Sequence, residues 1–417
     1  MTQQPLKPVF INERLHLLDA LRGFASFGII LVHVYVFSGY GWMDEGIVQA
    51  MPSYQVDKVV QAILEILVDT KFITIFSILF GVGFSIQLER AKVSGVNFKG
   101  YFLKRMAVLL TIACVHAYLL WFGDIIRYYA LCGMLLVLVS NWSNKTILRT
   151  AIFFGVFLTA AVFILNGILQ IGYPSHYPSR QQIYDAFIYG SFKEALVMNW
   201  RIDSLHNFIQ DSPITFVSVF GKILLGFWLG RIGFFQNSLA YGALQKKWIL
   251  AGIFIGIPSS IGLWAIKGGH LDLDGYWMMP LIFVIAGGLI LHSFLYISLF
   301  IRFFHKWGMH PVLKSFTIVG RMALTNYILQ SILCIIIFYG WFPGFKLRGV
   351  GPTSLFGISI VVFATQVLFT SWWLSKNQIG PVEWLWKKIV YKKTANVAHT
   401  ESCPVFNNKK VHTNEVQ

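Results

Sequence analysis

The sequence predicts an all-α fold: a polytopic membrane helix bundle of about ten transmembrane helices, with both the N-terminus and the C-terminus in the cytoplasm. Of the 417 residues, 56% are hydrophobic and only 12% are charged, which leaves too little polar surface for a soluble globule of this size. Ten apolar stretches are long enough to cross a bilayer core, for which a helix needs about 20 residues. They cover residues 17–38, 66–88, 104–123, 125–140, 149–171, 213–234, 248–267, 276–300, 315–341 and 354–375.

The first stretch begins like a signal peptide, but we expect it to remain in the protein as a membrane helix. Asp19 and Arg22 interrupt its start. It is also longer than the apolar region of a typical signal peptide, and no small-x-small cleavage site follows it. The fourth stretch, 125–140, is the shortest of the ten. Together the stretches predict a single transmembrane domain over residues 1–393.

Basic residues lie at the ends of the apolar stretches and indicate the orientation. With the N-terminus inside, 22 of the 34 lysines and arginines fall on the cytoplasmic side and 8 on the outer side, as the positive-inside rule requires. An even number of spans then places the C-terminus inside as well. The formal net charge of +16 does not indicate nucleic acid, because the basic residues are not gathered on a soluble domain. The expected partner is the lipid bilayer.

Two polar segments lie outside the stretches. Residues 172–212 mix apolar and charged side chains at helical intervals, which suits one or two amphipathic helices on the outer surface. Such helices would serve equally as a lid over an outward-facing site or as a plain interfacial cover. The tail, residues 394–417, is expected to be a disordered cytoplasmic end.

The sequence shows no framework for a metal, a disulfide or a tightly bound cofactor. Three of the four cysteines lie in apolar stretches and one in the tail, without paired spacing. We therefore interpret the cysteines as small, buried packing residues. No phosphate-binding loop, dinucleotide fingerprint or internal repeat is present. ATP-driven transport by this chain alone is therefore not expected, and the sequence carries no signal for an oligomeric state.

Arg22 and His33 are the most informative pair of polar residues in the first stretch. They are eleven residues apart, so on a helix they share one face and lie about 16 Å apart along the axis. A charged or titratable group inside a membrane helix is costly and usually functional. The alternative is a snorkelling arginine near the membrane surface and a satisfied interior histidine.

An inner polar layer is predicted from Asp19, Arg22 and Arg321, followed on the same stretch by Asn326 and, four residues later, Gln330. The arginines suit bidentate binding of phosphates or a carboxylate from the cytoplasmic side. An Asp19–Arg22 pair and amide bonds between helices would equally hold the bundle together without a ligand.

An outer polar layer is predicted from His33, Lys71, Asp124 and Arg127. A histidine there suits general base chemistry, with a carboxylate to fix its tautomer. The competing interpretations are a helix-end ion pair for Asp124 with Arg127 and an interfacial anchor for Lys71. His116 suits either packing or a proton relay, and packing is favoured.

Five motifs give the chain a resemblance to a known family. They are LLDALRGFASFGIILVH, KFITIFSILFGVGF, GDIIRYYAL, VGRMALTNYILQSILC and GPVEWLWKKIVY. In these the chain resembles the YeiB-like bacterial inner-membrane proteins, known as domain of unknown function 418. The resemblance covers about residues 14–392, with the C-terminal YeiB-like half at about 213–393. It implies a multi-pass protein of the bacterial inner membrane and no particular activity.

The spacing of Arg22 and His33 is also similar to a first-helix motif of membrane acyltransferases that modify surface polysaccharides, and Asp19 is similar to a residue of their lysosomal relatives. This resemblance implies an acyl-CoA donor from the cytoplasm and an extracytoplasmic sugar hydroxyl or amine as acceptor. His33 would then be catalytic, and Arg22 would orient the donor or the histidine.

The function expected from the sequence is therefore acyl transfer across the membrane. Acyl-CoA is the expected donor substrate, bound by Arg22 and Arg321 with help from Lys104 and Arg105, and a glycan or small molecule is the acceptor. The alternative is a transporter or permease in which the same residues bind a small anionic solute or relay protons. A membrane scaffold without catalysis is a third class.

Overall fold

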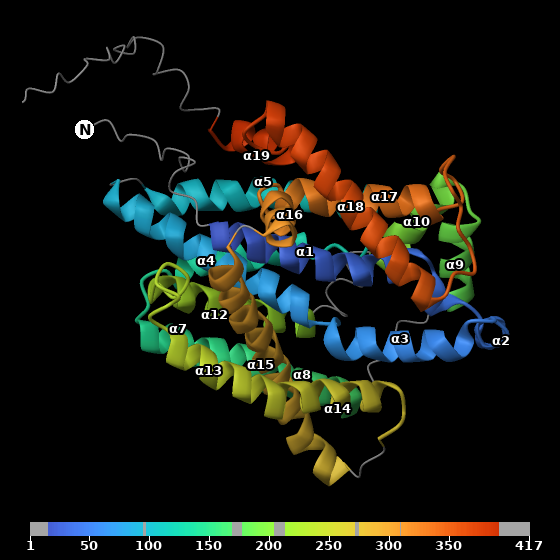
Figure 1. Ribbon diagram of the computed structural model, residues 1–417, viewed down its shortest axis with the longest axis horizontal. Coiled ribbons are helices and arrows are strands. Elements are labelled where there is room, and N and C mark those ends of the chain that lie inside the picture. Colours follow the sequence, from blue (N-terminus) through green and yellow to red (C-terminus); the bar gives the residue numbers. More distant parts are fainter. Residues whose placement is uncertain are drawn as a thin grey trace, which may run out of the picture.

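The structure is a computed structural model that describes residues 16–94, 97–168, 177–203, 213–271, 275–308 and 310–391, and every regular element in these ranges is helical (Figure 1). In chain order the elements are α1 (His16–Phe37), η2 (Tyr40–Trp42), α2 (Glu45–Gln49), α3 (Tyr54–Leu67), α4 (Lys71–Val93), α5 (Phe98–Leu119), α6 (Ile126–Leu138), α7 (Asn144–Ile152), η3 (Phe153–Leu158), α8 (Thr159–Ile168), α9 (Arg180–Ile188), α10 (Phe192–Ile202), α12 (Pro213–Arg231), α13 (Gly242–Ala251), η4 (Gly252–Gly256), α14 (Ile257–Lys267), α15 (Gly275–Trp307), α16 (Pro311–Gly320), α17 (Ala323–Phe338), α18 (Pro352–Lys376) and α19 (Pro381–Tyr391).

Seven helical segments are long and apolar enough to cross a membrane, counted over the described residues. They are α1, α5, the continuous α7–η3–α8, α12, the continuous α13–η4–α14, α15 and α18, and α16 with α17 makes an eighth if this bent pair is one span. The chain is therefore a multi-pass membrane protein. The stretches expected at 66–88 and 125–140 are helical too, as α4 and the 13-residue α6, but neither is among these candidates. Ten spans remain a prediction.

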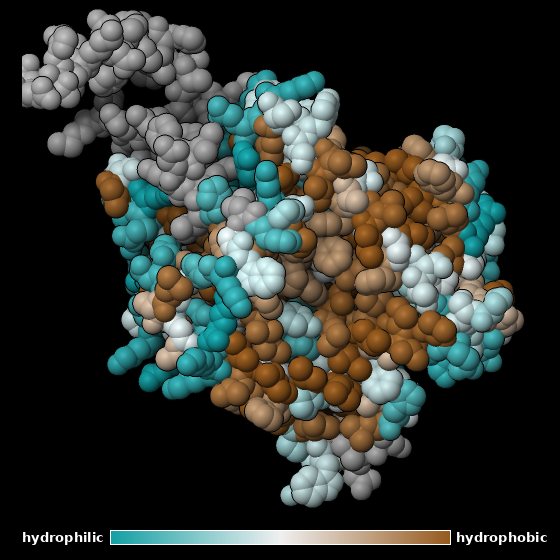
Figure 2. All heavy atoms as spheres, in the orientation of Figure 1, coloured by the Kyte–Doolittle hydropathy of each residue, from teal (hydrophilic) through white to brown (hydrophobic). Residues whose placement is uncertain are grey.

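The surface of the bundle is apolar over its middle. Figure 2 shows a broad band of hydrophobic side chains between polar regions at the two ends of this view. Large apolar side chains such as Phe254, Val361 and Leu368 are more than half exposed. An apolar surface of this extent is unfavourable in water and favourable in lipid.

The ninth expected span is not one straight helix. α16 ends at Gly320, α17 begins at Ala323, and the two are bent by 94°. The Glu383 carboxylate accepts hydrogen bonds from the backbone N–H groups of Leu324 and Thr325, which satisfies donors left open at the start of α17. The stretch expected at 315–341 is thus helical but broken, and the carboxylate that caps its second helix lies 58 residues after Thr325 in the chain.

Two glycines allow α1 to pack directly against α16. A Cβ atom at Gly23 would overlap the backbone of Phe316, and one at Gly320 would overlap the carbonyl of Asp19. Only residues without a side chain permit so close an approach. The contact places the polar start of α1 beside the break between α16 and α17.

The polar segment expected over 172–212 contains two short helices, α9 and α10, in its described part, residues 177–203. Ser179 and Ser191 begin these helices with reciprocal capping boxes, which is a strong helix start signal. Both helices lie at the same end of the bundle as α2 (Figure 1). The expected disordered tail, residues 394–417, falls outside the described residues.

Candidate functional site

A cavity of about 270 Å³ lies among α1, α4, α5, α6, α17 and α19. Three arginines line it, Arg22, Arg105 and Arg321, together with the carboxylate of Glu383 and many apolar side chains. We term it the arginine cavity. Its walls come from the first, second, third and ninth expected spans, which are here α1, α4, α5 and α17, and also from α6 and α19.

The arginines reach this cavity from three different elements. Arg22 Nη1 donates a hydrogen bond of 2.9 Å to Asp19 Oδ1, one turn earlier on α1, and its side chain stays 31% exposed. The Arg105 guanidinium lies over the Trp386 ring, 4.1 Å from its centroid, where the electron-rich ring face attracts the cation. Arg321 lies at the break between α16 and α17. Three guanidinium groups facing one cavity suit a ligand with several negative charges.

The terminal helix α19 closes one side of the arginine cavity. Trp386 Nε1 donates to the Arg105 carbonyl at 2.9 Å, and Lys104 Nζ donates to the Val390 carbonyl at 2.7 Å. With the capping of α17 by Glu383, these bonds tie α19 to α5 and α17. Lys104 therefore anchors α19 and is not part of the cavity lining.

The cavity wall also includes Tyr327 on α17 and Ile125 in the turn before α6. The backbone N–H of Ile125 donates to Tyr327 Oη at 3.4 Å. Ser331 follows Tyr327 by one helical turn, so both residues lie on the same side of α17. This part of the cavity wall adjoins a buried polar cluster.

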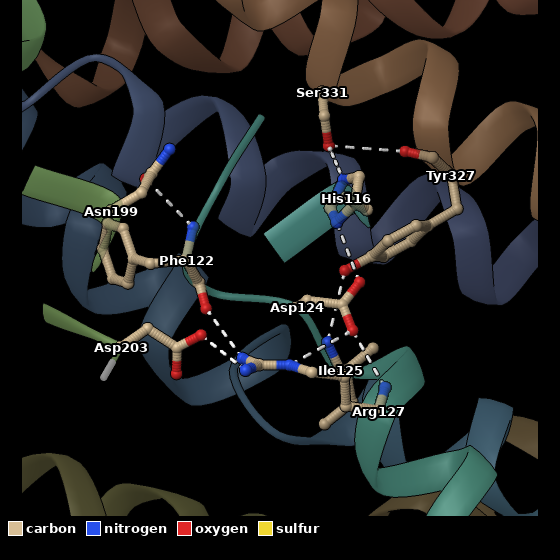
Figure 3. A network of polar contacts seen from close by, with 9 residues as sticks. All are labelled: His116, Phe122, Asp124, Ile125, Arg127, Asn199, Asp203, Tyr327 and Ser331. Atoms are coloured by element: carbon tan, nitrogen blue, oxygen red, sulfur yellow. Dashed lines mark hydrogen bonds and ion pairs between the residues drawn. The ribbon is translucent and has the colours of Figure 1, made fainter. Parts of the chain in front are cut away.

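The cluster is formed by His116, Asp124 and Ser331 (Figure 3). His116 Nε2 lies 2.9 Å from Ser331 Oγ, and His116 Nδ1 lies 2.8 Å from Asp124 Oδ2. The contact between His116 and Asp124 is within ion-pair distance, but its geometry is not that of a hydrogen bond. His116 and Asp124 are each 2% exposed and Ser331 is fully buried. The end of α5, the turn that follows it and the distant α17 thus bring an imidazole, a carboxylate and a hydroxyl together.

A histidine between a carboxylate and a hydroxyl is arranged to take the hydroxyl proton. The Ser331 hydroxyl donates to the Tyr327 carbonyl at 3.5 Å and can instead donate to His116. When Nδ1 is protonated, Nε2 is the acceptor for that O–H, and the nearby carboxylate stabilises the imidazolium that forms. The same contacts also join α5 to α17, so they contribute to the packing of the bundle as well.

The turn that carries Asp124 is held by α10 and the residue that ends it. Asp124 Oδ1 accepts from the backbone N–H of Arg127 at 2.9 Å, which caps the start of α6. The Arg127 guanidinium donates to the Phe122 carbonyl at 3.2 Å and lies 2.5 Å from Asp203 Oδ2. Asn199 Oδ1 accepts from the Phe122 N–H at 3.2 Å. The ion pair expected between Asp124 and Arg127 is long, at 3.9 Å, and Asp203 is the nearer partner.

Burial raises the pKa of the Asp203 carboxyl to about 6, and the Arg127 guanidinium opposes that rise. Because burial disfavours the charged carboxylate more than the arginine favours it, Asp203 titrates near the physiological range. Its contact with Arg127 therefore gains a full ion pair only as the pH rises through about 6.

His33 lies beside this cluster but has different surroundings. Its ring is buried against Trp121 and Tyr327, with centroids 4.6 and 5.4 Å away. Its Nδ1 has no hydrogen-bond partner among the described residues, and His33 is not part of the arginine cavity lining, in contrast to Arg22. The structure thus places a carboxylate against His116 rather than against His33, and catalysis by His33 stays a prediction.

Two other predicted site residues hold helices together. Lys71, fully buried at the start of α4, donates from Nζ to the Glu65 carbonyl at 3.3 Å. Asn326 donates from Nδ2 to the Val319 carbonyl and to Thr370 Oγ1, each at 3.0 Å. Neither residue lines the arginine cavity.

Five residues of the site were not expected from the sequence. Packing is the role that the sequence favours for His116, and it assigns no role to Tyr327, Ser331, Glu383 or Trp386. The last four do lie in the motifs VGRMALTNYILQSILC and GPVEWLWKKIVY, so the motifs were the available signal. Among the described residues no group of three or more histidine, cysteine or acidic side chains is placed to hold a metal ion.

Comparison with known proteins finds relatives over nearly the whole chain. The family model described as "Protein of unknown function (DUF418)" matches residues 229–393. The uncharacterized protein YxaH of Bacillus subtilis (strain 168) is 31% identical over 93% of this chain and 96% of its own length. The uncharacterized protein YeiB of Escherichia coli (strain K12) is 25% identical over 91% of this chain and 97% of its own. No solved structure matches the chain significantly.

Proposed function

The chain belongs to the DUF418 family of YeiB-like membrane proteins, and we propose that it is a membrane acyltransferase. It moves an acyl group from cytoplasmic acyl-CoA to a hydroxyl or amine of an extracytoplasmic sugar. One observation carries the proposal: the wall of the arginine cavity includes Tyr327, and one turn further along the same helix Ser331 lies against His116 and Asp124.

The donor occupies the arginine cavity in this proposal. Coenzyme A carries phosphate groups, a polar pantetheine arm and the acyl thioester. Arg22, Arg105 and Arg321 supply guanidinium groups for the phosphates, and the apolar lining suits the arm. The thioester then lies toward Tyr327, at the part of the wall nearest the buried cluster.

Transfer proceeds in two steps through a serine ester. In the first, Ser331 Oγ attacks the thioester carbonyl, its proton passes to His116 Nε2, the C–O bond forms, the C–S bond breaks and the proton leaves with the CoA thiol. In the second, an acceptor hydroxyl attacks the ester carbonyl, His116 takes the acceptor proton and returns it to Ser331 as the ester bond breaks. Since Ser331 is fully buried, the Tyr327 side chain has to turn aside for the thioester to reach it.

His33 is retained in the proposal as the alternative base. Two observations support this alternative: its Nδ1 has no hydrogen-bond partner among the described residues, and its ring contacts Tyr327. In that case the acceptor is deprotonated directly, and transfer takes one step.

The proposed membrane arrangement has ten spans, both termini in the cytoplasm and the inner bacterial membrane as its location. It adds α4 and α6 to the seven or eight candidate spans. The 22-to-8 distribution of basic residues supports it. In this arrangement the arginine cavity opens toward the cytoplasm, where acyl-CoA is made.

A permease for a small anionic solute is the second candidate. The break between α16 and α17, next to Arg321, favours it, because discontinuous helices commonly form the ion and substrate sites of transporters. In that function the arginines would bind the solute itself and no acylated product would form.

The test is CoA release by the purified protein. Wild type, His116→Gln and His33→Gln are incubated with acyl-CoAs of several chain lengths and candidate sugar acceptors, and free thiol is measured. We expect turnover in wild type and a loss of roughly 100-fold or more in His116→Gln, since positioned proton transfer contributes about 10²–10⁴ in rate. A comparable loss confined to His33→Gln would move the base to His33. Anion uptake into proteoliposomes without any CoA release would establish the permease instead.

A further inference from the structure

A second, larger cavity of about 440 Å³ lies among α8, α12, α14 and α15. Its walls are mainly isoleucine, leucine, phenylalanine and alanine side chains. We term it the lysine cavity, because Lys222, in the middle of α12, lies in its wall. Nothing in the proposed transfer reaction uses this residue.

Lys222 is an unusual residue for its position. It lies in the nineteen-residue apolar helix α12, nine residues from the first, which is about 14 Å along the axis. No hydrogen bond or ion pair joins its ammonium to another side chain or carbonyl within the described residues. A cation held at that depth is costly unless an anion or water compensates it. Among the described residues, the carboxylate that acts electrostatically on Lys222 is that of Asp69, which already accepts a hydrogen bond from Lys267.

The same face of α12 offers further polar groups. Thr215 and Ser218 precede Lys222 at helical spacing and line the same cavity. Two hydroxyls and an ammonium along one face form a place for a carboxylate or phosphate, and most of the remaining wall is apolar. Lys267 also lines the cavity, but its ammonium donates to Asp69 Oδ2 at 2.9 Å, so its charge is already paired.

We infer that the lysine cavity binds an anionic amphiphile, whose carboxylate or phosphate pairs with Lys222 and whose alkyl chain fills the apolar part. This inference goes beyond the proposed function and does not depend on it. The two are connected at one point, because Ile125 lines both the lysine cavity and the arginine cavity. If the protein transfers acyl groups, a lipid-linked acceptor in the lysine cavity lies on the opposite side of Ile125 from the donor.

The test is native mass spectrometry of the full chain in a neutral detergent, titrated with oleate, oleyl phosphate or oleyl alcohol. The three probes share one chain and differ in the headgroup. Wild type should bind at least one of the anions about tenfold or more tightly than the alcohol, because a charge-assisted bond contributes that much. Oleate preference would indicate a fatty acid, and oleyl phosphate preference a phospholipid-type headgroup. Either result supports the site.

Matched variants locate the binding. Lys222→Met should lose the preference for anions, Lys222→Arg should keep most of it, and Lys247→Met, which removes an exposed lysine outside the cavity, should behave as wild type. Equal binding of the anions and the alcohol by wild type would overturn the inference, as would full anion binding by folded Lys222→Met. If Lys222→Met is not recovered folded, Lys222→Arg and the headgroup comparison decide. None of these measurements involves CoA, so a failed transferase assay does not affect them.

Discussion

His116 Nε2 lies 2.9 Å from Ser331 Oγ, although the two residues are 215 positions apart in the chain. The contact joins α5 to α17 and is continued on the other side of the imidazole by Asp124. In a membrane interior such polar groups are costly to bury and are retained where they pair or act chemically. Substitution of Ser331 distinguishes a role in pairing from a role in chemistry.

Ser331→Ala should abolish acyl transfer and leave the protein folded. The expected loss is roughly 100-fold or more, because the nucleophile of the first step is absent, while the lost hydrogen bond costs only about 1 kcal/mol of stability. The measurement is CoA release, combined with a search for an acyl group on Ser331 after brief exposure to radiolabelled acyl-CoA. Ser298→Ala is the matched control, since Ser298 is also fully buried on a long helix and its hydroxyl has no partner among the described residues. Normal turnover by Ser331→Ala would exclude the serine ester.

Arg22→Ala and Arg321→Ala should each weaken acyl-CoA binding. A lost charge-assisted contact costs on the order of 1.5–3 kcal/mol, or roughly 10- to 150-fold in affinity, and the effect should shrink at high salt. Binding to the purified protein is measured by calorimetry. Arg302→Ala serves as control, because this arginine is exposed and lies outside the cavity lining. Unchanged affinity in both cavity variants would remove the donor site, and loss of folded protein would favour a purely structural role.

The fold class and much of the site could be predicted from local sequence features. Apolar length and composition predict a multi-pass helical protein, and the mixed segment before residue 212 predicts α9 and α10. Arg22 and Arg321 were placed in one polar layer from their positions at the ends of two apolar stretches, and the structure has them line one cavity.

The remainder depends on contacts between residues far apart in sequence. Arg321 and Met322 are ordinary helix formers, so nothing local indicates the break between α16 and α17, which Glu383 caps from another helix. Likewise, a histidine in an apolar stretch has no local sign of its partners. Asp124 follows His116 by only eight residues, but only the fold brings Ser331, 215 positions away, to the other nitrogen of the imidazole.

Asp203 should make the stability of the protein fall as the pH rises from about 4 to about 6. Burial raises the pKa of its carboxyl to about 6, so the folded protein binds this proton more tightly than the unfolded chain. That stabilisation is complete below the unfolded pKa near 4 and is lost as the pH rises through 6. It amounts to something on the order of 2–3 kcal/mol.

The comparison is between the melting temperatures of wild type and Asp203→Asn, measured in detergent from pH 4 to 7.5. The wild type should lose stability relative to the variant across pH 4–6, and the difference should become constant above about pH 7. A difference that does not change with pH would show that Asp203 keeps an ordinary pKa.

Gly320→Ala should destabilise the protein, although alanine normally favours a helix. The added Cβ would overlap the carbonyl of Asp19, so α1 and α16 must separate, at a cost of about 1–3 kcal/mol. Gly357→Ala is the matched control on α18, because nothing lies within 4 Å of a Cβ at that position. It should be neutral or stabilising by up to about 1 kcal/mol. Equal melting temperatures for the two variants would contradict the close contact between α1 and α16.

The ten-span arrangement predicts on which side of the membrane each connecting segment lies. Reporter fusions after residues 95, 145, 240 and 308 should report a cytoplasmic location, and fusions after 45, 190, 271 and 347 an extracytoplasmic one. The reason is the placement of lysine and arginine at the cytoplasmic ends of the apolar stretches, which are retained there during insertion. The pair at 95 and 145 tests whether α4 and α6 cross the membrane in addition to the seven or eight candidate spans. If either helix stays on one side, every later fusion reverses, so two or more reversed sites would rule out the ten-span arrangement.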